Sequence, residues 1–278
     1  MPFFKEKLRA VRFGCRLATS SFRLLPDFII IGAQKSGTTS LFHYLTLHPQ
    51  VKPSFTKEVH FFDGGKKPEI DTFAKGPSWY RAHFPLYTQK GRGFITGEAS
   101  PLYIFNPLAP QRIFNLVPEV KLIALLRNPV ERAISHYFHE KRKGREQLPA
   151  LEAFQSEKSR IEAALGQHDY KSLNFIHHTY LKRGLYAEQL ERYLQLFDKQ
   201  QLLLIKSEDF FNSPGEALAK TCGFLNINDK HHFSNLTPRN IGHNKHSIDN
   251  PVREYLMQYY LPHNQRLCNL LGQNFTWE

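Results

Sequence analysis

The stretch FIIIGAQKSGTTSL, residues 28–41, decides the fold of this chain. Its first four residues are apolar and predict a buried strand, and Leu41 and Leu45 have the spacing of one helix face. Between them lies a turn rich in glycine and hydroxyl side chains. A strand, a loop and a helix start in this order favour a bound anion, because the loop N–H groups and the helix dipole both attract negative charge.

The loop resembles the first half of a P-loop but departs from it at the end. Four residues separate Gly32 from Gly37, as in a P-loop, yet Thr38-Thr39 stands where the Lys-Ser/Thr pair is expected. The lysine lies inside the loop instead, at Lys35. An amine there can lie beside the bridging oxygen of a departing group, where negative charge develops during a transfer reaction.

The rest of the chain alternates predicted strands and helices. Further strands are expected at 93–97, 120–126 and 202–205, and helices at 38–47, from Pro129 onward, at 150–165, 186–197 and 250–272, with Pro262 kinking or stopping the last one. This alternation predicts an α/β protein with a P-loop-like three-layer fold, in which a central parallel sheet is flanked by helices. Ligands of such sheets bind beyond the carboxyl ends of the strands, where the loops after 28–31 and 120–126 both fall.

Length and charge limit the domain organisation and the partners. The 278 residues are enough for one domain over 26–278, and the net charge of +12 should attract anions. A nucleotide, an anionic polysaccharide or a nucleic acid would all satisfy that charge. Three scattered cysteines without CxxC spacing indicate neither a disulfide framework nor a zinc site, and the histidines show no metal-binding spacing, so we expect no metal.

Residues 1–25 form a separate basic segment, with six lysines and arginines and a single glutamate. Five residues of this segment recur on one helical face, namely Phe4, Leu8, Val11, Cys15 and Ala18. A basic amphipathic helix lying on the domain, or on the solvent side of it, is the first interpretation, and a membrane-surface helix or an organelle transit peptide is the alternative. Because no run of about 18 apolar residues occurs, we expect a cytoplasmic protein of bacterial type, with membrane association through this segment as the alternative.

Two more motifs follow the first loop, KEVHFFD at 57–63 and RNPVERAIS at 127–135. Together with GAQKSGTTSL at 32–41 they resemble, in the same order, the motifs of sulfotransferases that use 3′-phosphoadenylyl sulfate (PAPS). The second motif narrows the resemblance to the branch of heparan sulfate N- and 3-O-sulfotransferases. The resemblance runs from about Asp27 to the C-terminus. It implies PAPS as co-substrate, no metal, no nucleic-acid partner, and transfer to a carbohydrate hydroxyl or, as a lesser option, an amino group.

The resemblance assigns the donor side of the site. It implies that Lys35 neutralises the leaving phosphate, while four neighbours donate hydrogen bonds to the 5′-phosphosulfate: Ser36, Gly37, Thr38 and Thr39. It further implies that Arg127 and Ser135 bind the 3′-phosphate, because a guanidinium presents a planar fork to a phosphate and a hydroxyl adds a donor.

The acceptor side is assigned from the KEVHFFD motif. Glu58 is the candidate general base that takes the proton of the acceptor. By resemblance, Glu58, His60 and Asp63 face the acceptor sugar, and His60 also tunes the glutamate. We expect Ser100 and Tyr103 to contact the acceptor as well, Tyr103 by stacking on a sugar ring.

Two departures from the heparan sulfate branch affect the acceptor. Residues 98–101 read EASP where the 3-O-sulfotransferases carry a lysine after the glutamate. The nucleotide-closing Lys-Gly-Arg loop of that branch has its counterpart at 238–245, PRNIGHNK, where Arg239 or Lys245 would have to replace it. These differences argue against heparan sulfate itself as the acceptor, while the donor assignment is unaffected.

Three other functions stay open. The same chemistry could act on a lipid or polyketide hydroxyl. An ATP- or GTP-dependent P-loop kinase needs a lysine after Gly37 and an acidic Mg²⁺ ligand at a strand end, where this chain has Thr38 and Arg127. A non-catalytic nucleotide- or polyanion-binding protein would be expected to lose Lys35 or Glu58, and both are present.

Overall fold

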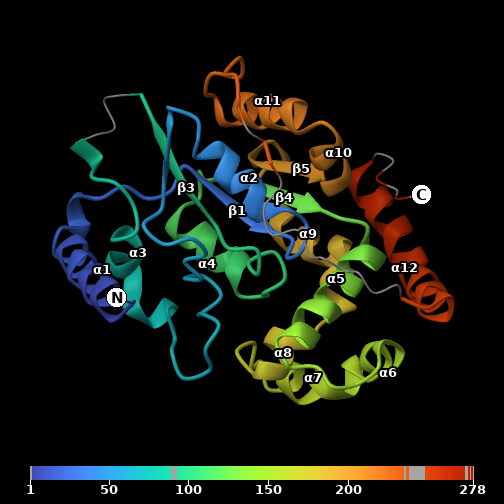
Figure 1. Cartoon of the computed structure of the whole chain (residues 1–278). Coiled ribbons are helices and arrows are strands. Elements are labelled where there is room, and N and C mark those ends of the chain that lie inside the picture. Colours follow the sequence, from blue (N-terminus) through green and yellow to red (C-terminus); the bar gives the residue numbers. More distant parts are fainter. Residues whose placement is uncertain are drawn as a thin grey trace.

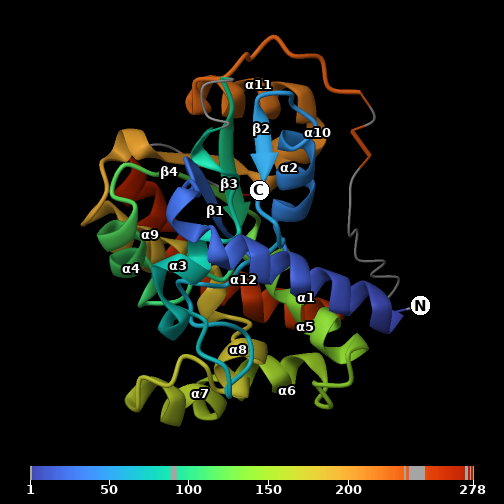
Figure 2. The same ribbon diagram turned by 90° about the vertical axis from the view of Figure 1, so that its left-hand side faces the viewer.

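A computed structural model describes residues 2–88, 93–234, 236–237, 248–272, 275 and 277. Its centre is a sheet of five parallel strands in the order β2-β3-β1-β4-β5. Figure 1 labels β3, β1, β4 and β5, and Figure 2 labels β2. The strands are β1 (Phe28–Gly32), β2 (Val51–Pro53), β3 (Ile95–Ala99), β4 (Lys121–Leu126) and β5 (Leu202–Lys206). β1 therefore lies in the middle, between β3 and β4. Because the three strands are parallel, the loops that follow β3 and β4 lie beside the loop that follows β1.

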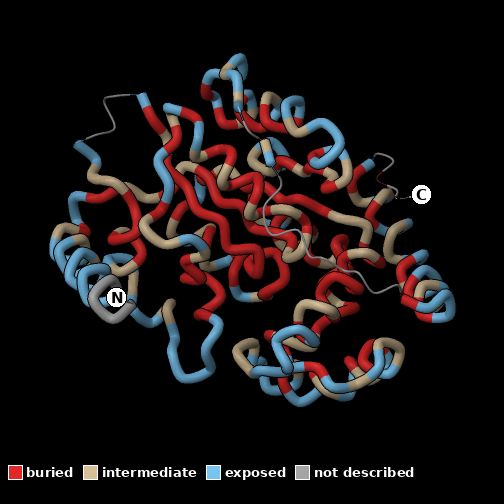
Figure 3. The backbone as a smooth tube through the Cα atoms, viewed as in Figure 1, coloured by how far each residue is buried: buried red, intermediate tan, exposed pale blue. Residues whose placement is uncertain are grey.

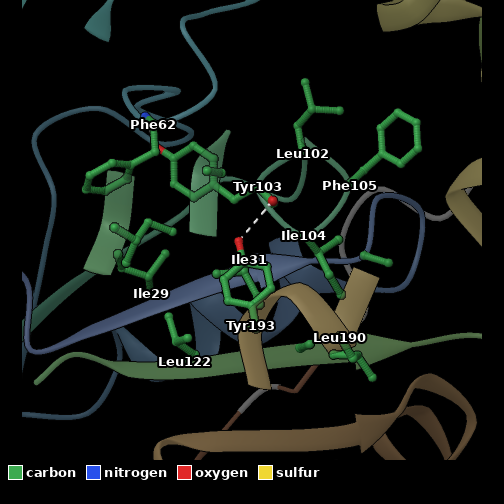
Figure 4. Close-up of a cluster of buried hydrophobic side chains, with 14 of the residues drawn as sticks. Ile29, Ile31, Phe62, Leu102, Tyr103, Ile104, Phe105, Leu122, Leu190 and Tyr193 are labelled. Atoms are coloured by element: carbon green, nitrogen blue, oxygen red, sulfur yellow. Dashed lines mark hydrogen bonds between the residues drawn. The ribbon is translucent and has the colours of Figure 1, made fainter. Parts of the chain in front are cut away.

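Helices cover both faces of the sheet, because successive strand residues point to opposite sides. Ile29 and Ile31 of β1 belong to one apolar core, which Figure 4 shows with Leu190 of helix α9 (Tyr186–Leu194). Phe28 and Ile30 belong to the other. The first face carries α4 (Ala109–Leu116), α9 (Tyr186–Leu194) and α12 (Asn250–Leu271), and the second carries α2 (Thr38–Leu45), α10 (Ser207–Asn212) and α11 (Pro214–Leu225). The predicted three-layer α/β fold is confirmed.

Details of several elements differ from the prediction. β2 was not expected, because its three residues include Pro53 and form an edge strand that only its pairing with β3 defines. The run 150–165 is divided into α6 (Ala150–Gln155) and α7 (Glu157–Gly166). Of the two effects expected of Pro262, to kink or to stop the last helix, the second does not occur, because α12 continues to Leu271 before Gly272 adopts a left-handed conformation. Buried Tyr260 and Leu267 on either side of the proline hold that helix against the domain.

The remaining helices surround this core. They are α1 (Pro2–Ala18), α3 (Gly76–Arg81), α5 (Pro129–Arg142) and α8 (Leu173–His177). Figure 2 shows α1 lying across the domain beside α3. Asn128 caps α5, because its side chain accepts hydrogen bonds from the N–H groups of Val130 and Glu131. In the ranges that the structure describes, no helix has the length and apolar character needed to cross a membrane.

Candidate active site

The loop between β1 and α2 is built as an anion cradle. Lys35 and Gly37 both have positive φ angles, of 74° and 93°, a backbone conformation in which N–H groups of a loop can form an anion-binding concavity. Gly37 is required there, because a Cβ at this position would lie 2.8 Å from the ring of Phe211. Gly37 is also the N-cap of α2, so Thr38 and Thr39 occupy its first turn as the sequence predicted.

Ser36 provides a buried hydroxyl in this loop. Its backbone carbonyl accepts a hydrogen bond of 2.9 Å from the Oγ of Ser207, which fixes the loop against α10. Its own Oγ is buried and has no hydrogen-bond partner in the described part of the chain. A buried hydroxyl without a protein partner is available to donate a hydrogen bond to a bound oxyanion.

The amine of Lys35 lies in a strongly cationic environment. Burial, together with the charges of Arg142, Arg127 and Arg132, lowers the pKa of Lys35 to about 8. An anion bound in the loop would counter this repulsion and restore the charged form. The loop therefore has the electrostatics of a phosphate site.

Arg127 connects the end of β4 to this loop. Its guanidinium donates a hydrogen bond of 3.1 Å to the backbone carbonyl of Lys35. The carbonyl of Arg127 in turn accepts a hydrogen bond of 2.9 Å from the hydroxyl of Tyr186, which holds the turn in place. The structure thus brings Arg127 and the loop together, as the strand-end rule predicted. Ser135 lies on α5 and is buried, and no hydrogen bond among the described residues links it to Arg127.

Glu58 forms the centre of a second cluster. Its Oε2 accepts a hydrogen bond of 2.6 Å from Lys66 and lies 3.4 Å from the Nε2 of His60, while Lys57 is 3.6 Å from its Oε1. Burial opposes ionisation of Glu58, but the hydrogen bonds from His60 and Lys66 and the charge of Lys66 outweigh it, so the pKa of Glu58 is lowered. Glu58 is therefore an ionised carboxylate at neutral pH.

His60 is held from its other side by Asp63. The Nδ1 of His60 and the Oδ2 of Asp63 are 2.5 Å apart, and Asp63 also accepts a hydrogen bond from the N–H of Gly65. Burial disfavours the imidazolium, yet the charge and the hydrogen bond of Asp63 outweigh it and raise the pKa of His60. Glu58, His60 and Asp63 thus form one hydrogen-bonded row that can hold and pass a proton.

Residues at the end of β3 hold the backbone of this row through hydrogen bonds. Glu98 is fully buried and accepts hydrogen bonds from Ser100 (2.7 Å), Tyr80 (2.8 Å) and Tyr103 (3.1 Å). Ser100 accepts a hydrogen bond from the N–H of His60. Burial raises the pKa of Glu98, although these three hydrogen bonds oppose the shift. The network therefore fixes the backbone on which His60 is mounted.

Ser100 and Tyr103 do not face an acceptor. Both are fully buried, and Figure 4 shows Tyr103 among core residues next to Phe62. The hydroxyl of Tyr103 accepts a hydrogen bond of 2.8 Å from the N–H of Phe61. The prediction that these two side chains contact the acceptor is corrected to a supporting role, because each uses its hydroxyl within the protein and has no exposed surface.

Lys57 joins the two clusters. Its amine donates a hydrogen bond of 2.7 Å to the Oγ1 of Thr39, so the Glu58 segment lies directly against the anion loop. Sequence reasoning missed Lys57 and Lys66, since a lysine in a polar loop carries no local signal of its partner. The expected substitutes for the closing loop, Arg239 and Lys245, lie outside the described residues.

Comparison with known proteins agrees with this geometry. The sulfotransferase domain family matches residues 25–247. Membrane-associated sulfotransferase kil1 of Dictyostelium discoideum is 29% identical, covering 99% of this chain and 71% of that protein. The crystal structure of a sulfotransferase from Alicyclobacillus acidocaldarius is 31% identical with a TM-score of 0.69, covering 90% of this chain and 97% of the other. The chain therefore belongs to the sulfotransferase family of enzymes, as its three motifs predicted.

Its relatives include the branch that the second motif indicated. Mouse heparan sulfate glucosamine 3-O-sulfotransferase 6 is 30% identical, covering 92% of this chain and 75% of that protein. Human heparan sulfate glucosamine 3-O-sulfotransferase 3A1 is 32% identical, covering 91% of this chain and 63% of that protein.

Proposed function

We propose that this protein transfers the sulfuryl group of PAPS to a hydroxyl group of a carbohydrate, with an amino group as the lesser option. One observation carries the proposal: the hydrogen bond from Lys57 to Thr39 sets an ionised carboxylate, Glu58, against a cationic loop that contains Lys35. A base and an anion site in such proximity are what an in-line group transfer needs.

The donor would bind along the carboxyl ends of β1 and β4. Ser36 and the N–H groups of residues 37–39 suit the 5′-phosphosulfate, and Lys35 suits the oxygen on which charge develops. Arg127 and Ser135 are proposed to bind the 3′-phosphate, Arg127 because it is tied to the Lys35 carbonyl at the mouth of the loop.

In the reaction, the acceptor oxygen forms a bond to sulfur while the bond from sulfur to the phosphate oxygen breaks. Glu58 takes the proton of the acceptor hydroxyl, and the electron pair of the broken bond stays on the phosphate of adenosine 3′,5′-bisphosphate. The row of His60 and Asp63 holds Glu58 in its ionised form before the reaction and shares the proton afterwards.

A carbohydrate acceptor is supported by relatives whose names specify the glucosamine of heparan sulfate. Lipid and polyketide hydroxyls stay as alternatives, since the lysine that the heparan sulfate branch carries after Glu98 is Ala99 here. A location at a membrane is a further proposal, in line with the name of one relative, the membrane-associated sulfotransferase kil1.

Two variants test the proposal with radiolabelled PAPS and a panel of polysaccharides, glycolipids and polyketides. Glu58→Gln should lower sulfuryl transfer by about 10²–10⁴-fold while calorimetry shows near wild-type affinity for adenosine 3′,5′-bisphosphate. Lys35→Ala should remove transfer and weaken that nucleotide too. Nucleotide binding should need no Mg²⁺. If the Glu58→Gln enzyme is active, Glu58 is not the base. If the wild-type protein does not bind adenosine 3′,5′-bisphosphate, PAPS is not the sulfuryl donor.

A further inference from the structure

Helix α1 turns its apolar side to solvent, which is the reverse of an ordinary surface helix. Leu8 is 45% exposed, Val11 is 64% exposed and Cys15 is also exposed. Their spacing of three and four residues places them on one side of the helix. In Figure 3 most of α1 is drawn as exposed. We call these three residues the apolar stripe.

The opposite side of α1 is fastened to the domain through polar and aromatic contacts. The guanidinium of Arg16 donates hydrogen bonds to the carbonyl oxygens of Ala82 (2.6 Å) and Phe84 (2.7 Å). The ring of Phe13 packs against His83, with 4.8 Å between ring centroids. Because these contacts fix the rotation of the helix, the apolar stripe cannot turn toward the domain without breaking them.

The charge around the apolar stripe identifies what covers it. Residues 1–25 contain six lysines and arginines against Glu6. Lys7 and Arg12 are exposed and, by helical geometry, flank the stripe on its two sides. An apolar face bordered by cations complements a surface whose interior is apolar and whose rim is anionic, and a bilayer of anionic lipids has that composition.

We propose that α1 lies in the headgroup region of an anionic lipid bilayer, with the apolar stripe directed at the acyl chains and Lys7 and Arg12 at the phosphates. The helix also contacts the segment before the base, because Arg9 donates a hydrogen bond of 3.1 Å to the Oγ1 of Thr56. Membrane binding is independent of the proposed reaction, since it uses no residue of the active site.

Sedimentation with vesicles tests the proposal on the full chain. Wild type should bind vesicles of phosphatidylglycerol and phosphatidylcholine, bind pure phosphatidylcholine far less, and be released by salt. The double variant Leu8→Glu/Val11→Glu should bind at least about tenfold more weakly. A matched control, Met257→Glu/Leu261→Glu, makes the same change of charge and polarity at exposed positions of α12 and should bind like wild type. Equal binding by the first variant and wild type would overturn the proposal.

A probe on the apolar stripe distinguishes insertion from adsorption. An environment-sensitive fluorophore on Cys15, in a Cys268→Ser background with Cys222 buried, should shift to the blue when anionic vesicles are added. Binding without a shift would mean attraction by charge alone and would contradict insertion. A dimer in sedimentation velocity that Leu8→Glu/Val11→Glu dissociates, with no vesicle binding by wild type, would assign the stripe to a second copy of the chain instead.

Discussion

The amine of Lys66 donates a hydrogen bond of 2.6 Å to the Oε2 of Glu58, the carboxylate that we assign as the base. The two residues are eight positions apart in an irregular segment, so their contact depends on the path of the loop and not on the spacing of a helix turn. Together with the hydrogen bond from His60, this pairing keeps Glu58 ionised. Lys66 and His60 both contact Oε2, while Oε1 has, among the described residues, only Lys57 at 3.6 Å, so Oε1 is the oxygen that we propose for the acceptor hydroxyl.

Replacing Lys66 by alanine should change the pH dependence of activity. Without this cation the pKa of Glu58 rises toward its ordinary value, so the base becomes protonated at a higher pH as the solution is acidified. The acid limb of the kcat/KM profile should move to higher pH, with little change at neutral pH. The exposed neighbour Lys67→Ala serves as the control. Identical acid limbs in wild type and Lys66→Ala would show that Lys66 does not act on the base.

Binding of adenosine 3′,5′-bisphosphate should take up protons above neutral pH. Because the pKa of Lys35 is lowered to about 8, part of the protein has a neutral amine at pH 8, and a bound phosphate restores the charge. Affinity should consequently fall as the pH rises through 8. Calorimetry in buffers of different ionisation enthalpy measures the uptake. Lys35→Arg, whose charge is permanent, should show none, and an unchanged uptake in that variant would assign the proton to another group.

Arg127→Ala should discriminate between two nucleotides. The loss of a charge-assisted contact should weaken adenosine 3′,5′-bisphosphate by about 2–3 kcal/mol, and adenosine 5′-phosphate far less. The comparison matters because Arg127 also bonds the carbonyl of Lys35. Damage to the loop would weaken both nucleotides equally, and such a result would remove Arg127 from the 3′-phosphate site.

Tyr103→Phe should affect turnover without affecting nucleotide binding, because Tyr103 supports the segment that carries Glu58 and His60. The variant leaves the N–H of Phe61 without its buried acceptor, at a cost of about 1–3 kcal/mol in the free energy of unfolding. We expect a lower kcat and an unchanged affinity for adenosine 3′,5′-bisphosphate, since the anion loop rests on other strands. Chemical denaturation and calorimetry measure the two effects, with the exposed Tyr87→Phe as control. Unaltered turnover in a destabilised Tyr103→Phe protein would mean that the hydroxyl only stabilises the fold.

Local sequence patterns predicted three of the sheet's strands, because each of them is a mainly apolar run. The apolar runs at 28–31 and 120–126 are buried on both faces, and the run at 202–205 is buried on one face and half-buried on the other. β2 has only three residues and exists through its pairing with β3, more than forty residues away in sequence. Periodicity also predicted the N-terminal helix, but it identifies an apolar face without indicating what that face contacts.

In the candidate site, too, some residues were predicted from the sequence and others were not. Lys35, Glu58 and Arg127 were predicted because each stands in a motif with a fixed spacing. The contacts of Lys57 with Thr39 and of Lys66 with Glu58 were not, since the path of the 57–66 segment depends on positive φ angles at Glu58 and His60 and on the buried network beneath them. Such contacts arise from tertiary packing and leave no periodic trace in the sequence.

The two halves of the site rest on different strands, the anion loop on β1 and β4 and the base row on the buried carboxyl group at the end of β3. Residues that contact only the base row can therefore be substituted with little effect on the anion loop, whereas Lys57, which donates a hydrogen bond to Thr39, couples the two halves. In the proposed reaction, a change of acceptor would then require substitutions around the end of β3 and would leave the donor half intact.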